Sequence, residues 1–180
     1  GFRHRAAPLH PDLRVALARM SDPSDKTDDN GPAGAAQVSS VLFACTMNSI
    51  RSPMAERLFK SLLGTTVYCD SVGIEEGETD GFAVAVMSER GLDMAGHKSK
   101  RFDDLEDIYF DLIITLSPQA HHKALDLAAG QAIDVEYWPT MDPSTVAGSR
   151  DQVLVAYRQT RDALEEKIRS RFAVSPEKEK

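Results

Sequence analysis

The strongest candidates for chemistry in this sequence are Cys45 and Arg51, which five intervening residues separate. A short apolar run precedes the cysteine and a helical pattern follows the arginine, so this segment is expected to lead from a strand into a helix. Successive backbone N–H groups in such a loop, backed by the helix dipole, form a cradle for a tetrahedral oxyanion. The same field favours a thiolate, and an arginine can hold two oxygens of the anion. The spacing predicts a thiolate nucleophile aimed at a bound oxyanion.

Short buried strands and amphipathic helices alternate along the rest of the chain, which is typical of a parallel sheet covered by helices. The clearest helix follows the loop, because apolar residues recur there at helical spacing, Pro53 suits a first turn and Gly64 ends the pattern. Two further helices are expected at residues 82–90 and 118–129. A long terminal helix is expected to bury Val153, Tyr157, Leu164, Ile168 and Phe172. Strands are expected at residues 40–44, 66–70, 110–116 and 133–138.

The composition narrows the classes of partner. The 180 residues carry a net charge of -7 with an isoelectric point near 5.2, which argues against general affinity for nucleic acid or an anionic membrane. An anionic substrate must therefore be met by local donors. Two cysteines, Cys45 and Cys69, are too few for a disulfide framework, and this favours a reducing cytoplasm. No apolar run approaches the roughly 20 residues needed to cross a bilayer.

The charge pattern near the N-terminus suggests where the folded domain begins. Residues 1–19 hold four arginines against one aspartate, whereas residues 20–37 hold four aspartates against one lysine. We interpret 1–19 as sequence upstream of a natural start at Met20, with a basic tail that contacts a partner as the alternative. Because residues 1–37 have little to bury, they are predicted to be a disordered leader. The domain is predicted to span 38–174, followed by a charged tail at 175–180.

Several segments around and beyond the loop together form a recognisable pattern: Val41-Leu42-Phe43-Ala44, Asn48, Arg51-Ser52-Pro53-Met54-Ala55-Glu56, Ser71-Val72-Gly73, Gly91-Leu92-Asp93, Gly96-His97-Lys98-Ser99, residues 110–114 and Asp142-Pro143. In these segments the sequence resembles the low-molecular-weight protein tyrosine phosphatases, over roughly residues 40–172 and in the order of the family. The resemblance implies a three-layer, flavodoxin-like α/β fold with a four-stranded parallel sheet. It also implies hydrolysis of phosphomonoesters, with phosphotyrosine on a protein as the expected substrate and neither metal nor organic cofactor.

The resemblance also implies a role for each matching residue. Cys45 would attack phosphorus and form a phosphocysteine, Arg51 would hold the phosphoryl oxygens, and Asp142 would protonate the leaving oxygen and then activate water. Ser52 would donate a hydrogen bond to the thiolate, with a plain helix N-cap as the alternative. Asn48 would hold a left-handed turn through Ser71 and His97. The phosphate-binding loop would comprise Thr46, Met47, Asn48, Ser49, Ile50, Arg51 and Ser52.

The sequence departs from the family pattern at three places. Met47 stands where the family usually has glycine, and Ile50 stands where it usually has a second cysteine. Ser144-Thr145 replaces an aromatic pair that walls the phosphotyrosine pocket. Trp138, Tyr137 and Phe82 are the remaining candidates for an aromatic wall.

Two other functions compete with hydrolysis. A related family of the same fold reduces arsenate by passing a disulfide along further cysteines, which here would require Cys69. A module that binds a phosphorylated residue without hydrolysing it is the second alternative, although a binder needs neither Cys45 nor Asp142. The oligomeric state has no signal in the sequence.

Overall fold

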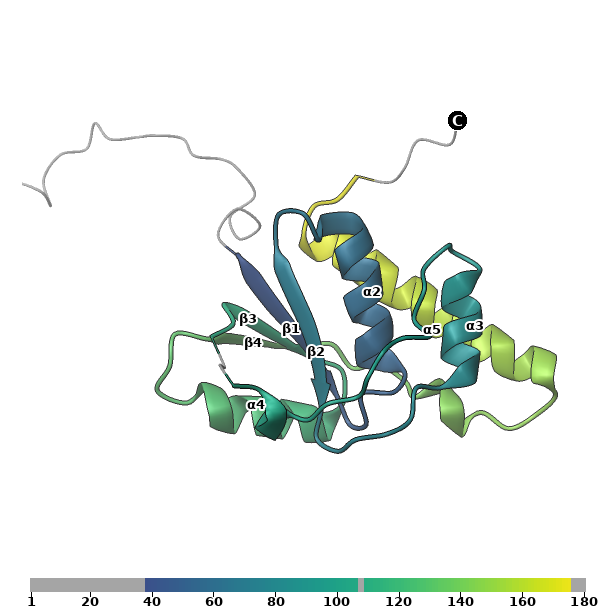
Figure 1. The fold of residues 1–180 in the computed structure, drawn as a ribbon, viewed down its shortest axis with the longest axis horizontal. Coiled ribbons are helices and arrows are strands. Elements are labelled where there is room, and N and C mark those ends of the chain that lie inside the picture. Colours follow the sequence, from purple (N-terminus) through teal and green to yellow (C-terminus); the bar gives the residue numbers. More distant parts are fainter. Residues whose placement is uncertain (1–37, 107–108, 176–180) are drawn as a thin grey trace, which may run out of the picture. The chain divides into compact units, whose positions relative to one another are not determined.

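The computed structural model describes residues 38–106 and 109–175, which form a parallel sheet with helices on both faces (Figure 1). The strands are ordered β2-β1-β3-β4, so the predicted α/β fold with a four-stranded parallel sheet is confirmed. The predicted leader at 1–37 and all but the first residue of the predicted tail at 175–180 lie outside the described residues, and these boundaries stay predictions. The strands are β1 (Ser40–Cys45), β2 (Tyr68–Gly73), β3 (Leu112–Thr115) and β4 (Asp134–Tyr137).

The central strand β1 is buried on both faces, and its side chains divide the core in two. Val41, Phe43 and Cys45 pack with residues of α2 and α5, whereas Leu42 and Ala44 pack on the opposite face with residues of α4. This alternation follows from the two-residue period of a strand. No helix in the described part is long and apolar enough to span a membrane. The helices are α2 (Arg51–Leu63), α3 (Gly81–Ser88), α4 (Pro118–Ala128) and α5 (Arg150–Arg171), with short 3₁₀ turns at Phe102–Asp104 and Pro143–Thr145.

The second strand lies further along the chain than the apolar pattern predicted. Residues 71–73 continue β2 because they pair with residues 43–45 of β1, although Ser71 and Gly73 interrupt the apolar run. Cys69 therefore lies near the start of β2, where it pairs with Val41, whereas the predicted strand at 66–70 placed it near the end. Its side chain is 2% exposed, so Cys69 is a buried core residue.

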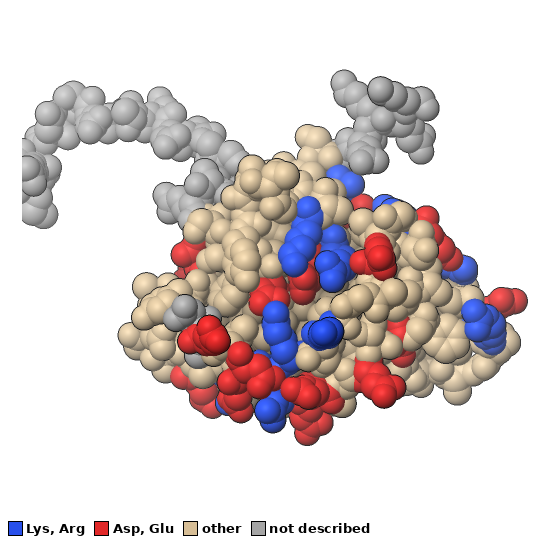
Figure 2. All heavy atoms as spheres, viewed as in Figure 1, with Lys and Arg blue, Asp and Glu red and all other residues tan. Residues whose placement is uncertain are grey.

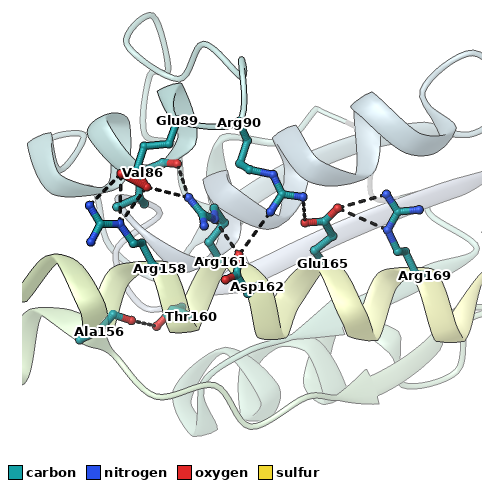
Figure 3. Close-up of polar contacts among 10 residues, drawn as sticks. All are labelled: Val86, Glu89, Arg90, Ala156, Arg158, Thr160, Arg161, Asp162, Glu165 and Arg169. Carbon is teal, nitrogen blue, oxygen red and sulfur yellow. Dashed lines mark hydrogen bonds and ion pairs between the residues drawn. The ribbon is translucent and has the colours of Figure 1, made fainter. Parts of the chain in front are cut away.

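Helix α3 is fastened to α5 by charged side chains (Figure 3). Arg161 of α5 is buried and donates both to the Val86 carbonyl near the end of α3 and to Glu89. Arg158 adds a bidentate pair with the same glutamate, and the pKa of Glu89 falls to about 2 because it accepts hydrogen bonds from both arginines. These contacts fix α3, whose opposite end touches the loop that follows β1.

Candidate functional site

The loop from Cys45 to Arg51 occupies the carboxyl edge of the sheet, where β1 leads into α2. Asn48 adopts a left-handed conformation with a φ of 51°, as predicted for the turn within the loop. Gly73 at the end of β2 lies so close that a Cβ there would stand 2.8 Å from the Asn48 nitrogen. Glycine is thus required where the two backbones meet.

The loop carbonyls are turned away from its centre, because each accepts a hydrogen bond from a group outside the loop. The donors belong to the segment after β2, to Ser99 and His97, to the residue before α3 and to the first turn of α2. A peptide N–H points opposite to the carbonyl in the same peptide plane. The N–H groups of residues 46–51 are therefore directed into the loop, as an oxyanion cradle requires. The carbonyls are those of Cys45, Thr46, Met47, Asn48, Ser49 and Ile50.

A small cavity of about 80 Å³ opens inside this loop. The three residues predicted to do the chemistry, Cys45, Arg51 and Asp142, all line it, although 97 positions separate the first from the last. Helix α2 begins in the lining of this cavity with Ile50 as its N-cap residue and without a side-chain cap. Its first N–H groups are thus available to an anion. The remaining lining residues are Met47, Ser49, Ile50 and Ser144.

The Asn48 side chain is the centre of the hydrogen-bond network beneath the loop. Its amide nitrogen donates to Ser52 Oγ at 2.8 Å and to Ser71 Oγ at 3.0 Å, while its Oδ1 accepts from the Lys100 backbone at 3.0 Å. His97 Nε2 lies 3.0 Å from the same Oδ1 and must donate to it, since Oδ1 has no hydrogen. The predicted support residues Asn48, Ser71 and His97 are thus brought together.

The direction of this network leaves the Ser52 hydrogen for the nucleophile. Because Ser52 Oγ accepts from Asn48, it can donate its own hydrogen to Cys45 Sγ, which lies 2.9 Å away. The Val72 carbonyl is a more distant acceptor at 3.3 Å. The alternative that Ser52 caps the helix is wrong, because α2 begins at Arg51 and Ser52 is its second residue.

Two titratable groups hold the network in one protonation state. Burial lowers the pKa of His97, which keeps the ring neutral at neutral pH with its hydrogen on Nε2. Burial alone would raise the pKa of Glu56, but hydrogen bonds from Lys60 and Ser71 outweigh it and hold the pKa below its ordinary value. The Glu56 carboxylate therefore accepts from Ser71 at 2.6 Å. Glu56 stood in the matching segment, but no role was predicted for it.

Asp142 and Arg51 are positioned by the same short segment. Asp142 Oδ1 accepts hydrogen bonds from the Ser144 nitrogen and hydroxyl at 2.9 and 2.7 Å. Within the described residues, the hydrogen bonds to this carboxylate end on Oδ1, so Oδ2 is the oxygen left for a proton. Arg51 Nη1 donates to the Thr140 carbonyl at 2.9 Å. The contact with Thr140 could not be predicted from the sequence, because every residue has a backbone carbonyl. The contacts with Ser144 could have been predicted from the Asp-Pro-Ser turn.

A second unpredicted support reaches the loop from α3 and α5. The Asp80 nitrogen donates to the Ser49 carbonyl at 3.2 Å, and the Asp80 carboxylate both caps α3 and accepts from the Tyr157 hydroxyl at 3.0 Å. Burial, followed by the charge of Asp80, raises the pKa of Tyr157, so the phenol stays protonated and donates. The sequence indicated Tyr157 as a buried position of the last helix, and its hydroxyl gave no further signal.

The three aromatic residues considered as a pocket wall do not line the cavity. Trp138 packs edge-on against Phe43 in the core, and Tyr137 stacks on His121. Phe82 packs against Tyr157 with the two rings tilted by 41° and lies beneath the Arg150 guanidinium. The lining of this cavity is therefore free of aromatic side chains.

Comparison with known proteins places this geometry in a family. The sequence model of the low molecular weight phosphotyrosine protein phosphatases matches residues 40–179. An arsenate reductase of Bacillus licheniformis is 34% identical over 139 residues, which cover 76% of this chain and 96% of the relative. A solved arsenate reductase in its phosphate-binding state is 28% identical, with a TM-score of 0.63 over 76% of this chain and 99% of that one.

A third relative acts on a different substrate. The Bacillus subtilis arginine phosphatase YwlE, solved with a phosphorylated active-site serine, is 26% identical. Its TM-score is 0.60 over 72% of this chain and 91% of that one. The fold, the loop and the extent of the sequence match agree, and the chain belongs to the low molecular weight phosphotyrosine protein phosphatase family.

Proposed function

We propose that this chain hydrolyses phosphomonoesters on protein side chains, phosphotyrosine first among them, through a phosphocysteine at Cys45. One observation carries the proposal: the outward carbonyls of the loop direct its N–H groups into a cavity that Cys45, Arg51 and Asp142 share. On the face that carries α2 and β2, Lys and Arg are interspersed with Asp and Glu (Figure 2). Local donors, and not an extended basic surface there, would therefore hold the phosphoryl group.

The proposed reaction has two steps. The Cys45 thiolate attacks phosphorus, the bond to the leaving oxygen breaks, and Asp142 gives that oxygen its proton. Asp142 then takes a proton from water, the resulting hydroxide attacks the phosphocysteine, and the sulfur leaves as a thiolate with phosphate as the product. Ser52 would stabilise the thiolate before the first step and after the second. Both cysteines are free, which is consistent with the reducing cytoplasm proposed as its location.

The test is hydrolysis of p-nitrophenyl phosphate in the presence of EDTA. We expect turnover by the wild-type chain and none by Cys45→Ser, because the serine hydroxyl lacks the nucleophilic thiolate. The variant should still bind inorganic phosphate, since the cradle is made by the backbone and Arg51. A wild-type chain that binds phosphate without turnover would instead support the binding module.

Side-chain specificity requires a second comparison. Phosphotyrosine and phosphoarginine peptides of one sequence should be offered to the enzyme, because the family name and the solved relative YwlE point to different residues. We expect the phosphotyrosine peptide to give the higher kcat/KM. A higher kcat/KM for the phosphoarginine peptide would leave the proposed phosphocysteine mechanism in place but would make phosphoarginine the preferred substrate.

Arsenate reduction is the second candidate, favoured by the relative from Bacillus licheniformis. It needs a second thiol, and Cys69 pairs with Val41 while Cys45 pairs with Gly73, four residues further along the strands. That offset amounts to about 13 Å, whereas a disulfide needs Cβ atoms about 3.5–4.5 Å apart. Burial also raises the pKa of Cys69 and keeps it a thiol. An external thiol would therefore have to complete the reaction. Arsenate reductase activity can be tested by supplying dithiothreitol as that thiol and measuring the arsenite formed from arsenate.

The same distance predicts how the enzyme responds to oxidation. Activity lost to peroxide should be poorly restored by dithiothreitol, because Cys45 has no thiol within reach to trap its sulfenic acid before further oxidation. Intact mass should show added oxygens on Cys45. Ile50→Cys should make the loss largely reversible, since position 50 lines the same cavity. Full recovery of the wild-type chain together with a Cys45–Cys69 peptide would contradict the prediction and favour the reductase.

A further inference from the structure

Met47 occupies the mouth of the candidate site and is its most exposed apolar side chain. Among the seven lining residues, Cys45 and Ile50 are buried, Ser49, Arg51 and Asp142 are half-buried, and Met47 and Ser144 are exposed. The cavity has a volume of about 80 Å³, and the nucleophile Cys45 lies at its buried end. The exposed residues Met47 and Ser144 are therefore the lining residues that the group carrying the phosphate meets at the opening.

The Met47 side chain has a fixed place against the segment that follows β2. A Cβ added at Gly77 would stand 3.3 Å from Met47 Cβ and 3.4 Å from its Cε, so the thioether packs directly on this glycine. Ser99 ties the two residues together, because its hydroxyl donates to the Met47 carbonyl at 3.0 Å and accepts from the Gly77 nitrogen at 3.1 Å. The wall is therefore held in position before any ligand arrives.

From this geometry we propose that Met47 determines specificity by forming the wall on which an aromatic leaving group packs. The inference rests on the proposed function and deepens it. A methionine sulfur makes favourable contacts with aromatic rings, and its flexible chain adapts to their shape. The lining contains no aromatic side chain that could take this part. Met47 would thus favour aryl over alkyl phosphoryl ligands.

Binding of two unreactive phosphonates tests the proposal without requiring turnover. Benzylphosphonate and methylphosphonate share the charged group, and only the first has a ring. The ratio of their dissociation constants therefore measures how much the contact between the ring and Met47 contributes to binding. We expect the wild-type chain to prefer benzylphosphonate and Met47→Ala to reduce this preference about 2- to 10-fold, the range expected for a sulfur–aromatic contact. Met47→Leu should keep only part of the preference, because it retains the apolar volume but lacks the sulfur.

Gly77→Ala provides an independent variant outside the lining. Its new methyl group would displace Met47 by a few tenths of an ångström without a strained backbone, and we expect a smaller preference for benzylphosphonate. An equal preference in wild type and Met47→Ala, with both phosphonates bound, would overturn the role of Met47 and leave the phosphatase proposal in place. Failure of the wild-type chain to bind either phosphonate would overturn both.

Discussion

Replacing Arg51 with lysine is expected to lower kcat for p-nitrophenyl phosphate by about 10²- to 10³-fold, the loss typical of removing one donor to a transition-state oxyanion. The guanidinium presents two parallel donors to two phosphoryl oxygens, whereas an ammonium is a point charge that cannot reproduce this fork. Arg51 also uses Nη1 to reach the Thr140 carbonyl at 2.9 Å. One planar group therefore contacts the segment that carries Asp142 while it faces the cavity.

A matched substitution separates this loss from a general effect of lysine. Arg158→Lys changes a half-buried arginine that pairs with Glu89 beyond the end of α3 away from the loop. Its kcat should stay within a few-fold of the wild-type value. The melting temperatures and the inhibition constants for inorganic phosphate should be measured for both variants. A kcat for Arg51→Lys within tenfold of wild type, with weaker phosphate binding alone, would show that Arg51 contributes to ground-state binding and not to the transition state.

The parts of the site that sequence could predict are those carried by side-chain type and spacing. Cys45, Asn48 and Arg51 lie as expected because strand, loop and helix follow one another within a few residues, and local patterns describe such units well. Asp142 is far along the chain, and its place at the cavity could be expected only through the family resemblance. The fold could be predicted from the alternation of strands and helices. The main error was at β2, because Ser71 and Gly73 interrupt the apolar pattern and residues 71–73 were left out of the predicted strand.

The parts that could not be predicted depend on backbone atoms and long-range packing. The carbonyls of the loop are held by N–H groups and side chains from four separate segments, and a backbone N–H has no signature in the sequence. The bond from Asp80 to Ser49 depends on how α3 docks on α5, which the buried Arg161 helps to fix. The sequence could therefore predict the chemistry of the loop. The orientation of the loop's peptide groups depends on the tertiary structure.

The second large effect concerns Asp142, whose proton should matter in proportion to the basicity of the leaving oxygen. We expect Asp142→Ala to slow hydrolysis of phenyl phosphate by about 10²- to 10⁴-fold, the usual range for a general acid. The loss should be much smaller for p-nitrophenyl phosphate, because nitrophenolate is stable without protonation. Asp142 Oδ1 is occupied by Ser144, so the proton is expected on Oδ2.

Asp142→Asn separates the proton from the turn that the carboxylate supports. An asparagine Oδ1 can still accept from the Ser144 nitrogen and hydroxyl and so preserve the 3₁₀ turn at Pro143–Thr145, but it has no acidic proton to give. If Asp142 acts as the acid, both variants should show the same dependence on the leaving group, and Asn should retain the wild-type melting temperature more closely than Ala. Equal losses on both substrates in both variants would remove Asp142 from the acid role. If Asp142→Asn kept near-wild-type activity while Asp142→Ala lost it, the role of Asp142 would be to support the turn. Only the alanine variant would then have lost what the activity requires.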